Sequence, residues 1–536
     1  MIGTAWLAPL ADTGPARRLA DAALIRLAHK RTRDLDRLDL VRAQENTLLR
    51  LVRKARDTQF GRAHHFDRIE SVAEFQARVP IREYEYFWQT YWKDPYPRIE
   101  GKTWPGFVPY YALSSGTTSG TTKYIPITRE MVRSNQKAAF TTLALFRHVR
   151  PRDELFTGKF FFLGGSTDLR RQDDGSLAGD LSGIAARENL DLLRPYQFPP
   201  DDITTIADWE VKVQKLAEQG VKERITAISG VPAWVLVLFD RMKKVTGKQT
   251  VAEIWPDLRL VVHGGTNFAP YRDLFTKEIG SDRVSFIETY PASEGFVATE
   301  DPRYGMLRLL PDHNIFFEFV PADELGSDKA PRHTLREVEP GVRYAVVLST
   351  CAGLWAYLVG DTVTFERTNP PLLRFSGRTK HFLSAFGEHL IAEEIENAVA
   401  HAARVCGTDV VDFHVGPVFP TDPRTPGHHV YLVEFVGTTP DVSRFSKALD
   451  DELIRLNEDY AAHRVGDLSM LSPRVRPVAK GSFADWMKSR GKYGGQNKVP
   501  RMDNTGVLTK ELEGWFGEKD GFGFQNFNLG SLGYLS

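Results

Sequence analysis

The chain has 536 residues, of which 42% are hydrophobic and 26% charged, with 69 basic and 69 acidic side chains. This length predicts two or more domains, and the composition is that of an ordinary soluble globular protein. The balanced charge removes any global electrostatic argument for a nucleic-acid or anionic-membrane partner.

Sequence features that would direct the chain to another compartment are weak. The first residues lack the basic start and sustained apolar segment of a signal peptide, and residues 344–360 are too short and too interrupted for a membrane span. The two cysteines, Cys351 and Cys406, build neither a disulfide framework nor a zinc spacing. We therefore expect a cytoplasmic protein that does not act at a membrane.

The predicted elements divide the chain into two domains. Residues 15–57 form a helical lead-in in which Leu19, Ala23 and Leu27 recur at a spacing of four. Strands and helices then alternate, which predicts a largely parallel sheet that binds ligands beyond the carboxyl ends of its strands. The expected strands are 107–113, 124–127, 224–228, 258–262 and 284–289, and the expected helices are 229–245, ended by Gly247, and 270–279.

Antiparallel strands are expected next, at 315–320, 344–350, 355–359 and 362–366. After Gly387 the pattern changes to helix 392–402, strands 410–415 and 429–436, and helix 442–460. We predict an α/β protein with a large N-terminal domain of mixed and parallel sheets over 1–387 and a smaller, mobile α+β domain over 388–536.

A loop of hydroxyls and glycines is the most informative segment. It reads Ser-Ser-Gly-Thr-Thr-Ser-Gly-Thr-Thr-Lys from Ser114 to Lys123, between two expected strands. Such a loop presents backbone N–H groups and hydroxyls to an anion, and Lys123 adds a positive charge. It is not the Walker loop, because Gly-Lys-Ser/Thr is missing. The pattern fits a nucleotide polyphosphate, although a polar surface loop has the same composition.

Four later segments carry further polar groups. Tyr290-Pro-Ala-Ser-Glu294 places a carboxylate at an expected strand end, where it suits Mg²⁺ shared with phosphates. Gly360-Asp361 is interpreted as a turn whose carboxylate can accept both ribose hydroxyls. Arg378 follows in Gly-Arg-Thr-Lys, and Lys498 lies in Asn-Lys-Val-Pro-Arg after a glycine-rich stretch.

In this order, the motifs resemble those of the adenylate-forming superfamily. More narrowly, Ser-Ser-Gly-Thr-Thr-Ser-Gly, Tyr-Pro-Ala-Ser-Glu, Tyr-Leu-Val-Gly-Asp, Leu-Asn-Glu-Asp-Tyr and Asn-Lys-Val-Pro-Arg resemble the Gretchen Hagen three family of acyl-acid amido synthetases. The resemblance covers about residues 40–505, and we expect a bacterial member. It implies a large domain that holds ATP and a carboxylic acid, and a mobile domain hinged near residues 380–390.

The resemblance also implies roles for single residues. Glu294 would bind Mg²⁺ and Lys498 would meet the reacting carboxylate and the α-phosphate, so these two are the expected catalytic residues. The other expected cofactor-binding residues are Ser114, Ser115, Gly116, Thr117, Thr118 and Lys123 at the phosphates, Gly264, Gly265 and Tyr290 at the adenine, Asp361 at the ribose, and Ser293 and Arg378. Two departures from the pattern are Lys380, where the superfamily usually has Asp, and Pro291, which stiffens its turn.

The implied reaction is ATP-dependent formation of an acyl adenylate with release of pyrophosphate, followed by acyl transfer to an amino acid amine. Mg²⁺ and Lys498 would offset the repulsion of two anions. Two alternatives stay open: an acyl-CoA synthetase with the same first step, and a non-catalytic nucleotide-binding scaffold. The sequence identifies neither the acid nor the oligomeric state.

Several of these residues also have an ordinary structural explanation. Glu294 could cap a following helix, Asp361 could be a turn residue, and Lys123 and Lys498 could be solvated. His428 and His429 are interpreted as structural residues of a loop, without a metal. The aromatic residues Trp104, Phe107, Tyr110 and Tyr111 are assigned to core packing.

Overall fold

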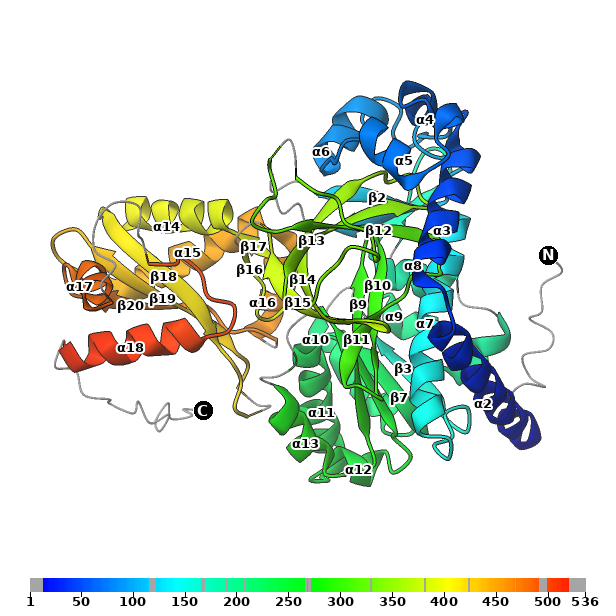
Figure 1. Cartoon of the computed structure of the whole chain (residues 1–536). Helices are drawn as coiled ribbons and strands as arrows, with labels where there is room; N and C mark the ends of the chain where they lie inside the picture. The colour runs from blue at the N-terminus through cyan, green and yellow to red at the C-terminus, as the bar shows by residue number, and fades with distance from the viewer. Residues whose placement is uncertain are drawn as a thin grey trace. The chain divides into compact units, whose positions relative to one another are not determined.

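The computed structural model describes residues 13–114, 122–164, 169–188, 191–206, 209–265, 268, 271–327, 330–379, 382–422, 425–467, 469–490 and 499–519. The chain divides into two compact units, Met1–Lys380 and His381–Ser536. The domain boundary that we expected, after residue 387, lies slightly further along the chain and stays a prediction. Figure 1 labels the helices and strands of each unit.

The first unit is built around a large mixed sheet whose strand order is β12-β13-β14-β15-β11-β10-β9-β8-β7-β3-β6. Strands β6, β3, β7, β8 and β9 run parallel to one another, and the remaining pairs are antiparallel. The strands are β3 Lys159–Leu163, β6 Gln197–Phe198, β7 Ile225–Gly230, β8 Leu260–Gly264, β9 Ser285–Ala292, β10 Gly295–Asp301, β11 Met306–Leu309, β12 Ile315–Pro321, β13 Arg343–Thr350, β14 Tyr357–Thr368 and β15 Pro371–Arg378. The expected combination of parallel and antiparallel strands in an α/β protein is confirmed.

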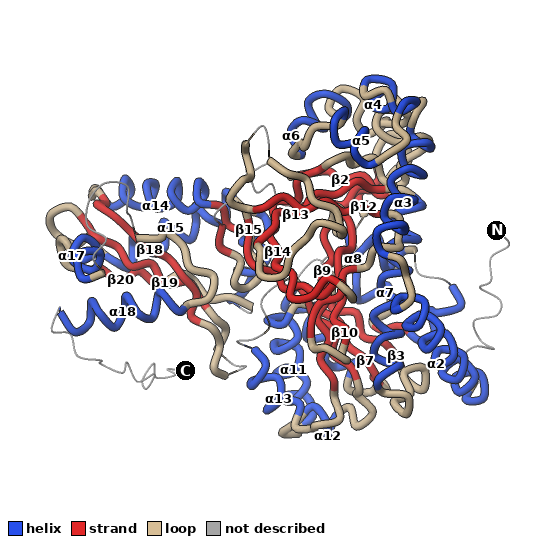
Figure 2. Tube along the Cα trace, in the orientation of Figure 1, coloured by secondary structure: helices blue, strands red, loops and turns tan. Residues whose placement is uncertain are grey.

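A smaller sheet of order β2-β1-β5-β4 lies in the same unit (Figure 2). Its strands are β1 Tyr110–Ser114, β2 Lys123–Ile127, β4 Arg170–Arg171 and β5 Leu177–Gly179. The helices of this unit are α2 Gly14–Asp36, α3 Leu40–Ala55, α4 Gln59–Ala63, α5 Val72–Arg78, α6 Tyr84–Phe87, α7 Arg129–Val149, α8 Leu181–Arg187, α9 Asp201–Thr204, α10 Trp209–Gly220, α11 Pro232–Thr246, α12 Val251–Ile254 and α13 Arg272–Ile279.

Helices cover both faces of the parallel strands (Figure 1). Ile287 of β9 packs in a core with Leu24 of α2 and Phe146 of α7. The preceding residue, Phe286, points to the opposite face, where its ring meets Phe275 of α13 at 6.0 Å. Burial on both faces explains why these strands are nearly continuous apolar runs.

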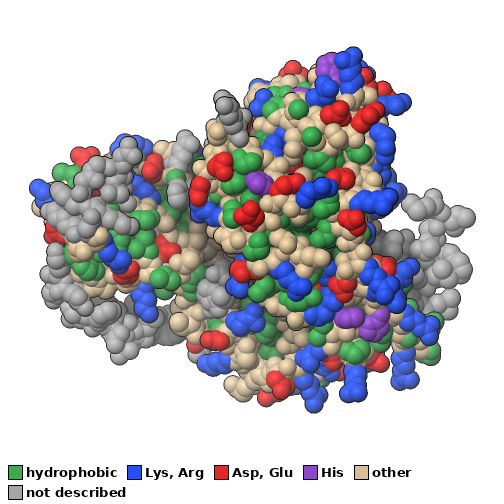
Figure 3. Space-filling view, in the orientation of Figure 1, with side chains coloured by type: hydrophobic (Ala, Val, Ile, Leu, Met, Phe, Trp, Pro, Cys, Tyr) green, Lys and Arg blue, Asp and Glu red, His purple; other side chains and the backbone are tan. Residues whose placement is uncertain are grey.

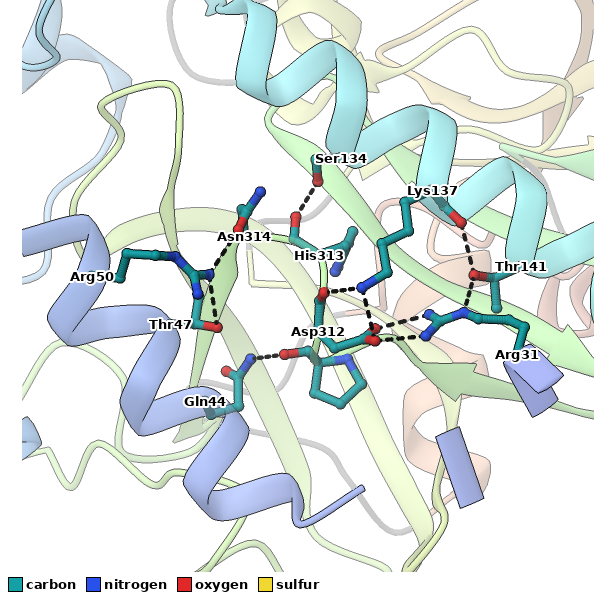
Figure 4. A network of polar contacts seen from close by, with 11 residues as sticks. Arg31, Gln44, Thr47, Arg50, Ser134, Lys137, Thr141, Asp312, His313 and Asn314 are labelled. Atoms are coloured by element: carbon teal, nitrogen blue, oxygen red, sulfur yellow. Dashed lines mark hydrogen bonds and ion pairs between the residues drawn. The ribbon is translucent and has the colours of Figure 1, made fainter. Parts of the chain in front are cut away.

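The N-terminal helix packs through a different face from the one that the sequence pattern suggested. Leu19 and Leu27 are 71% and 51% exposed, while Leu24, Ala28 and Leu35 are buried. The polar contacts of α2 explain the choice, because Arg31 donates to both carboxylate oxygens of Asp312, at 2.6 and 2.9 Å (Figure 4). Burial would raise the pKa of Asp312, but its bonds to Arg31 and Lys137 outweigh burial and lower it well below the usual range. The Arg31–Asp312 ion pair therefore determines which face of α2 packs inward, because the spacing of the apolar residues alone is ambiguous.

Other side chains in Figure 4 bind α3 to the same turn. The Gln44 amide donates to the carbonyl oxygens of Pro311 and Ile315, at 2.7 and 2.9 Å. Its own carbonyl accepts from the backbone N–H of Phe317. Three helices, α2, α3 and α7, thus meet the turn between β11 and β12.

The second unit is a smaller α+β fold. Its sheet has the order β18-β19-β20, with β18 and β19 antiparallel and β19 and β20 parallel, and β16 pairs with β17. The elements are β16 Phe382–Leu383, β17 Leu390–Ile391, α14 Ala392–Cys406, β18 Val410–Val418, β19 His428–Phe435, α15 Val442–Leu456, α16 Glu458–Arg464, β20 Arg474–Val478, α17 Ser482–Ser489 and α18 Val507–Lys519.

Two sequence expectations in this unit need correction. The helix expected over 442–460 is broken at Asn457, whose side chain accepts from the Tyr460 N–H and caps α16. His428 and His429 begin β19 instead of lying in a loop, because both pair with β18. His429 is buried, with its Nε2 atom 2.7 Å from Oε1 of Glu388, which supports a structural role.

Candidate active site

The two ends of the hydroxyl-rich loop are well defined. Ser114 ends β1 and Lys123 begins β2, and the two residues are paired across an antiparallel hairpin. The expected phosphate contacts Ser115, Gly116, Thr117 and Thr118 lie outside the described residues. Their role stays a prediction, and the hairpin shows only where such a loop begins and ends.

Lys123 is buried, which is unusual for a lysine beside a surface loop. Its ammonium group lies 5.6 Å from the centre of the Tyr84 ring. Tyr84 in turn accepts a hydrogen bond from the Tyr124 N–H at 2.9 Å. Within the described residues, no carboxylate forms an ion pair with Lys123, and its expected contact with phosphate stays a prediction.

The carboxyl ends of β8 and β9 approach each other closely at Gly264. A Cβ atom at this position would lie 2.4 Å from the carbonyl oxygen of Thr289, so only glycine fits. Gly265 follows with φ +81° and open space around it. Gly264 pairs with Thr289, the residue immediately before Tyr290. The result is a backbone surface that a flat ring could approach at the ends of parallel strands.

Strand β9 is longer than expected, and Tyr290 lies inside it. A tight turn at Ser293 and Glu294 connects β9 to β10, so no helix follows for Glu294 to cap, and that structural explanation is wrong. The Tyr290 hydroxyl donates to Oδ2 of Asp361 at 2.6 Å. Its ring meets Phe375 edge to face at 5.9 Å. Ser293 is half-buried in the turn.

Asp361 lies in the middle of a strand, which corrects the expected Gly-Asp turn. Strand β14 continues to Thr368, and Asp361 pairs with Arg378 of β15. Gly360 has φ +95°, and the pairing shifts just after it, between Thr362 and Val363. This irregularity marks a β-bulge, a feature that re-aims side chains near binding sites. The structure describes the backbone of Arg378.

Glu294 is only 7% exposed, yet none of the cationic side chains that the structure describes forms an ion pair with it. Its Oε1 atom accepts from the Tyr357 hydroxyl at 2.9 Å. Burial and the Glu294 charge raise the pKa of Tyr357 well above its usual range, so the phenol remains a donor. Of the residues that the structure describes, only Tyr357 donates to Glu294, which leaves Oε2 for another partner.

Around β14 the structure brings together three of the predicted site residues, Tyr290, Glu294 and Asp361. On strand β14, Asp361 accepts a hydrogen bond from the Tyr290 hydroxyl, and the Tyr357 hydroxyl donates one to Glu294. Helix α6 connects this pair to Lys123, because Tyr84 faces Lys123 and Phe87 contacts the Tyr357 ring at 6.0 Å. Lys498 belongs to the second unit and lies outside the described residues.

Sequence reasoning gave no role to Tyr84 or Tyr357. Tyr84 stands in an aromatic run that carries no spacing signal. For Tyr357 a signal was present, because Tyr357 precedes Asp361 by four residues just as Tyr290 precedes Glu294. The equal spacing lets the two segments exchange tyrosine and carboxylate partners.

Three family descriptions match the chain in order. They are the GH3 family N-terminal domain over residues 34–213 and 173–284, the central domain over 308–378 and the C-terminal domain over 393–506. The chain belongs to the GH3 family. This confirms the resemblance to the Gretchen Hagen three proteins, for which GH3 is the abbreviation.

Relatives of this GH3 chain are amido synthetases and ligases by name. It is 27% identical over 326 residues to indole-3-acetic acid-amido synthetase GH3.3 of Arabidopsis thaliana, a match that covers 56% of this chain and 53% of the relative. It is 29% identical over 215 residues to 4-substituted benzoates-glutamate ligase GH3.12 of the same plant, covering 37% of each. The chain thus spans about half the length of the first of these relatives.

The solved structure of AtGH3.15 acyl acid amido synthetase in complex with 2,4-DB has the same fold. The TM-score is 0.58 at 18% identity, and the match covers 92% of the GH3 chain and 96% of that structure. In the part of the chain that the structure describes, no helix is long and apolar enough to cross a membrane.

The site in the GH3 chain suits a cation that is shared with a ligand. Among the described residues no group of three or more His, Cys, Asp or Glu side chains could hold a metal ion. Mg²⁺ commonly takes one or two protein carboxylates and completes its shell with phosphate oxygens and water. Glu294, buried and with Oε2 open, fits that donor set.

Proposed function

We propose that this GH3 protein is an ATP-dependent acyl-acid ligase. It joins a carboxylic acid to the α-phosphate of ATP, releases pyrophosphate, and transfers the acyl group to the amine of an amino acid. The observation that supports this best is that β14 contacts both Glu294 and Tyr290, the latter through Asp361, while α6 connects Tyr357 of the same strand to Lys123.

The first step needs charge neutralisation, because an acid carboxylate and the α-phosphate are both anions. Glu294 would hold Mg²⁺, which neutralises phosphate charge when it is bound. Lys123 at the hairpin and Lys498 in the second unit would add two positive charges near the phosphates. Asp361, oriented by the Tyr290 hydroxyl, would accept the ribose hydroxyls. No protein nucleophile is required for this chemistry.

The second step is attack of the acceptor on the acyl carbonyl, with AMP as leaving group. We assign an amino acid as acceptor because the relatives named above are an amido synthetase and a glutamate ligase. Movement of the second unit would exchange the groups that face the acyl adenylate and limit its hydrolysis. The family membership and the joint presence of Glu294, Asp361 and Lys498 support a ligase over a purely binding role, because binding alone would not need Lys498.

The test is pyrophosphate release from ATP and Mg²⁺ with a panel of aromatic and aliphatic acids, with amino acids or CoA added. We expect acid-dependent release that amino acids stimulate, and an amide product in mass spectrometry. Lys498→Ala should reduce release about a hundredfold or more, the loss seen when a transition-state charge donor is removed. Lys510→Ala, an exposed lysine of the same unit, serves as the matched control and should keep full activity.

The other two outcomes would each support one of the alternative functions. Stimulation by CoA, with a thioester product, would make the protein an acyl-CoA synthetase. Tight ATP binding without turnover by any acid would support the non-catalytic scaffold.

A further inference from the structure

The two carboxylates of the candidate site, Asp361 and Glu294, each accept a hydrogen bond from a tyrosine hydroxyl. Tyr290 donates to Asp361 and Tyr357 donates to Glu294, at 2.6 and 2.9 Å, and the four residues join the end of the β9–β10 hairpin to β14. In each pair the phenol is the donor and a carboxylate oxygen is the acceptor. A tyrosine fits this task because it is rigid and neutral, and a lysine or arginine partner would cancel the charge.

The backbone of Tyr357 is fixed from both sides. It pairs with Leu348 of β13 on one edge and forms a parallel bridge with Arg82 on the other. The Arg82 N–H donates to Ala356 O at 3.0 Å, and the Leu358 N–H donates to Arg82 O at 2.9 Å. The hydroxyl therefore has little freedom to move away from Glu294.

The backbone beside Glu294 is fixed as well. A Cβ atom at Gly295 would lie 2.5 Å from Cδ1 of Ile315, so the turn rests directly on β12. The turn packs against Ile315 and Oε1 of Glu294 is bound by Tyr357, so the remaining oxygen, Oε2, has a fixed orientation. A single oriented oxygen is the donor that a cation shared with phosphates requires.

We infer that Tyr357 is a positioning residue for divalent cation binding: its hydroxyl holds Oε1 of Glu294 so that Oε2 is presented to the cation. This inference rests on the proposed function for the identity of the site, and it goes further in assigning a role to a residue that touches neither substrate nor metal. Hydrogen bonds to ligating carboxylates commonly tune metal affinity in this way.

The experiment measures Mn²⁺ affinity directly, by electron paramagnetic resonance of the full chain with α,β-methylene-ATP. Tyr357→Phe should weaken Mn²⁺ binding about tenfold, a loss typical of removing such a partner, and should raise the Mg²⁺ concentration that half-saturates pyrophosphate release by a similar factor. Tyr344→Phe is the matched control, since it also removes a buried phenol in the adjacent strand, where the hydroxyl accepts from the Glu339 N–H. It should bind Mn²⁺ as the wild type does.

A double variant separates positioning from stability. In a Glu294→Gln background, Tyr357→Phe should change Mn²⁺ affinity no further, because the tyrosine acts through Glu294. Unchanged Mn²⁺ affinity in a folded Tyr357→Phe protein would overturn the inference, as would a full additional loss in the Glu294→Gln background.

Two further measurements keep the inference testable if Tyr357→Phe does not fold or if the proposed function is wrong. If Tyr357→Phe does not fold, 3-fluorotyrosine at position 357 keeps the ring and the hydroxyl but changes the strength of the hydrogen-bond donor. A change of about twofold in Mn²⁺ affinity would support the inference. An unchanged Mn²⁺ affinity would overturn it. If no acid supports pyrophosphate release, the proposed function fails while the Mn²⁺ titration still tests Tyr357.

Discussion

Carboxylates in the first unit differ in whether a partner stabilises their charge. Hydrogen bonds from Arg303, at 2.7 and 3.0 Å, are the main reason that the pKa of Asp36 falls to about 2. Glu288 is the opposite case, because burial first and the neighbouring Glu300 second raise its pKa to about 7. Strands β9 and β10 place the two glutamates side by side, and the Glu288 N–H donates to Oε2 of Glu300 at 2.9 Å.

Glu288 should therefore make stability depend on pH. Between the ordinary glutamate pKa and about 7, the folded state binds more protons than the unfolded state, so the free energy of unfolding falls as pH rises. Glu288→Gln removes this loss. We expect the variant to be more stable than wild type at pH 8, by up to about 3 kcal/mol, and similar at pH 4.5.

Urea unfolding at several pH values between 4.5 and 8.5 measures this difference. Exposed Glu70, changed to Gln, provides the control and should follow the wild type throughout. A Glu288→Gln curve parallel to wild type at every pH would show that Glu288 ionises freely in the folded protein.

At the scale of elements, local chemistry predicted helices better than strand ends. Helix α11 begins at Pro232 and ends before Gly247 with φ +72°, close to the expected bounds. Strands β9 and β14 run beyond their expected ends, since motif residues that suggested turns pair with the next strand in the chain, β10 and β15. The face of α2 was missed because Asp312, which binds Arg31, is far from it along the chain.

The close approach of β8 and β9 predicts that a larger residue at position 264 disturbs both strands. Gly264→Ala would place its methyl group 2.4 Å from Thr289 O, so the strand ends must separate. We expect a loss of about 2 kcal/mol in stability and at least about tenfold weaker binding of α,β-methylene-ATP, because the surface beside Tyr290 is displaced. Urea unfolding and calorimetric titration measure the two effects.

Gly265→Ala is the neighbouring control. Its φ of +81° strains any other residue, at about 1 kcal/mol, but its surroundings are open. The strain should lower stability with less effect on nucleotide binding. Equal effects of both variants on binding would argue against steric contact as the cause.

For the whole molecule, the sequence predicted which motif residues lie near one another better than it predicted their contacts, and the roles of these residues stay predictions. The motif residues Glu294, Asp361, Gly264 and Tyr290 do come together in the first unit. The tyrosine that orients Glu294 could not be identified from one sequence, since its partner depends on how β14 meets the β9–β10 turn. Placement of Lys498 in another unit makes the proposed chemistry depend on both.

The two units have separate cores, and this leads to a prediction about their unfolding. Leu309 is fully buried in the core of the first unit, and Leu512 is fully buried with Leu432 and Phe483 in the second. We expect two transitions in calorimetry, with Leu512→Ala lowering one and Leu309→Ala the other, each by about 2 to 5 kcal/mol. Separate stability is what a ligase needs if the unit that carries Lys498 is to move while the unit that carries Glu294 stays folded. If either variant instead shifted every transition equally, the units would unfold as one body, and an independently moving second unit would lose its physical basis.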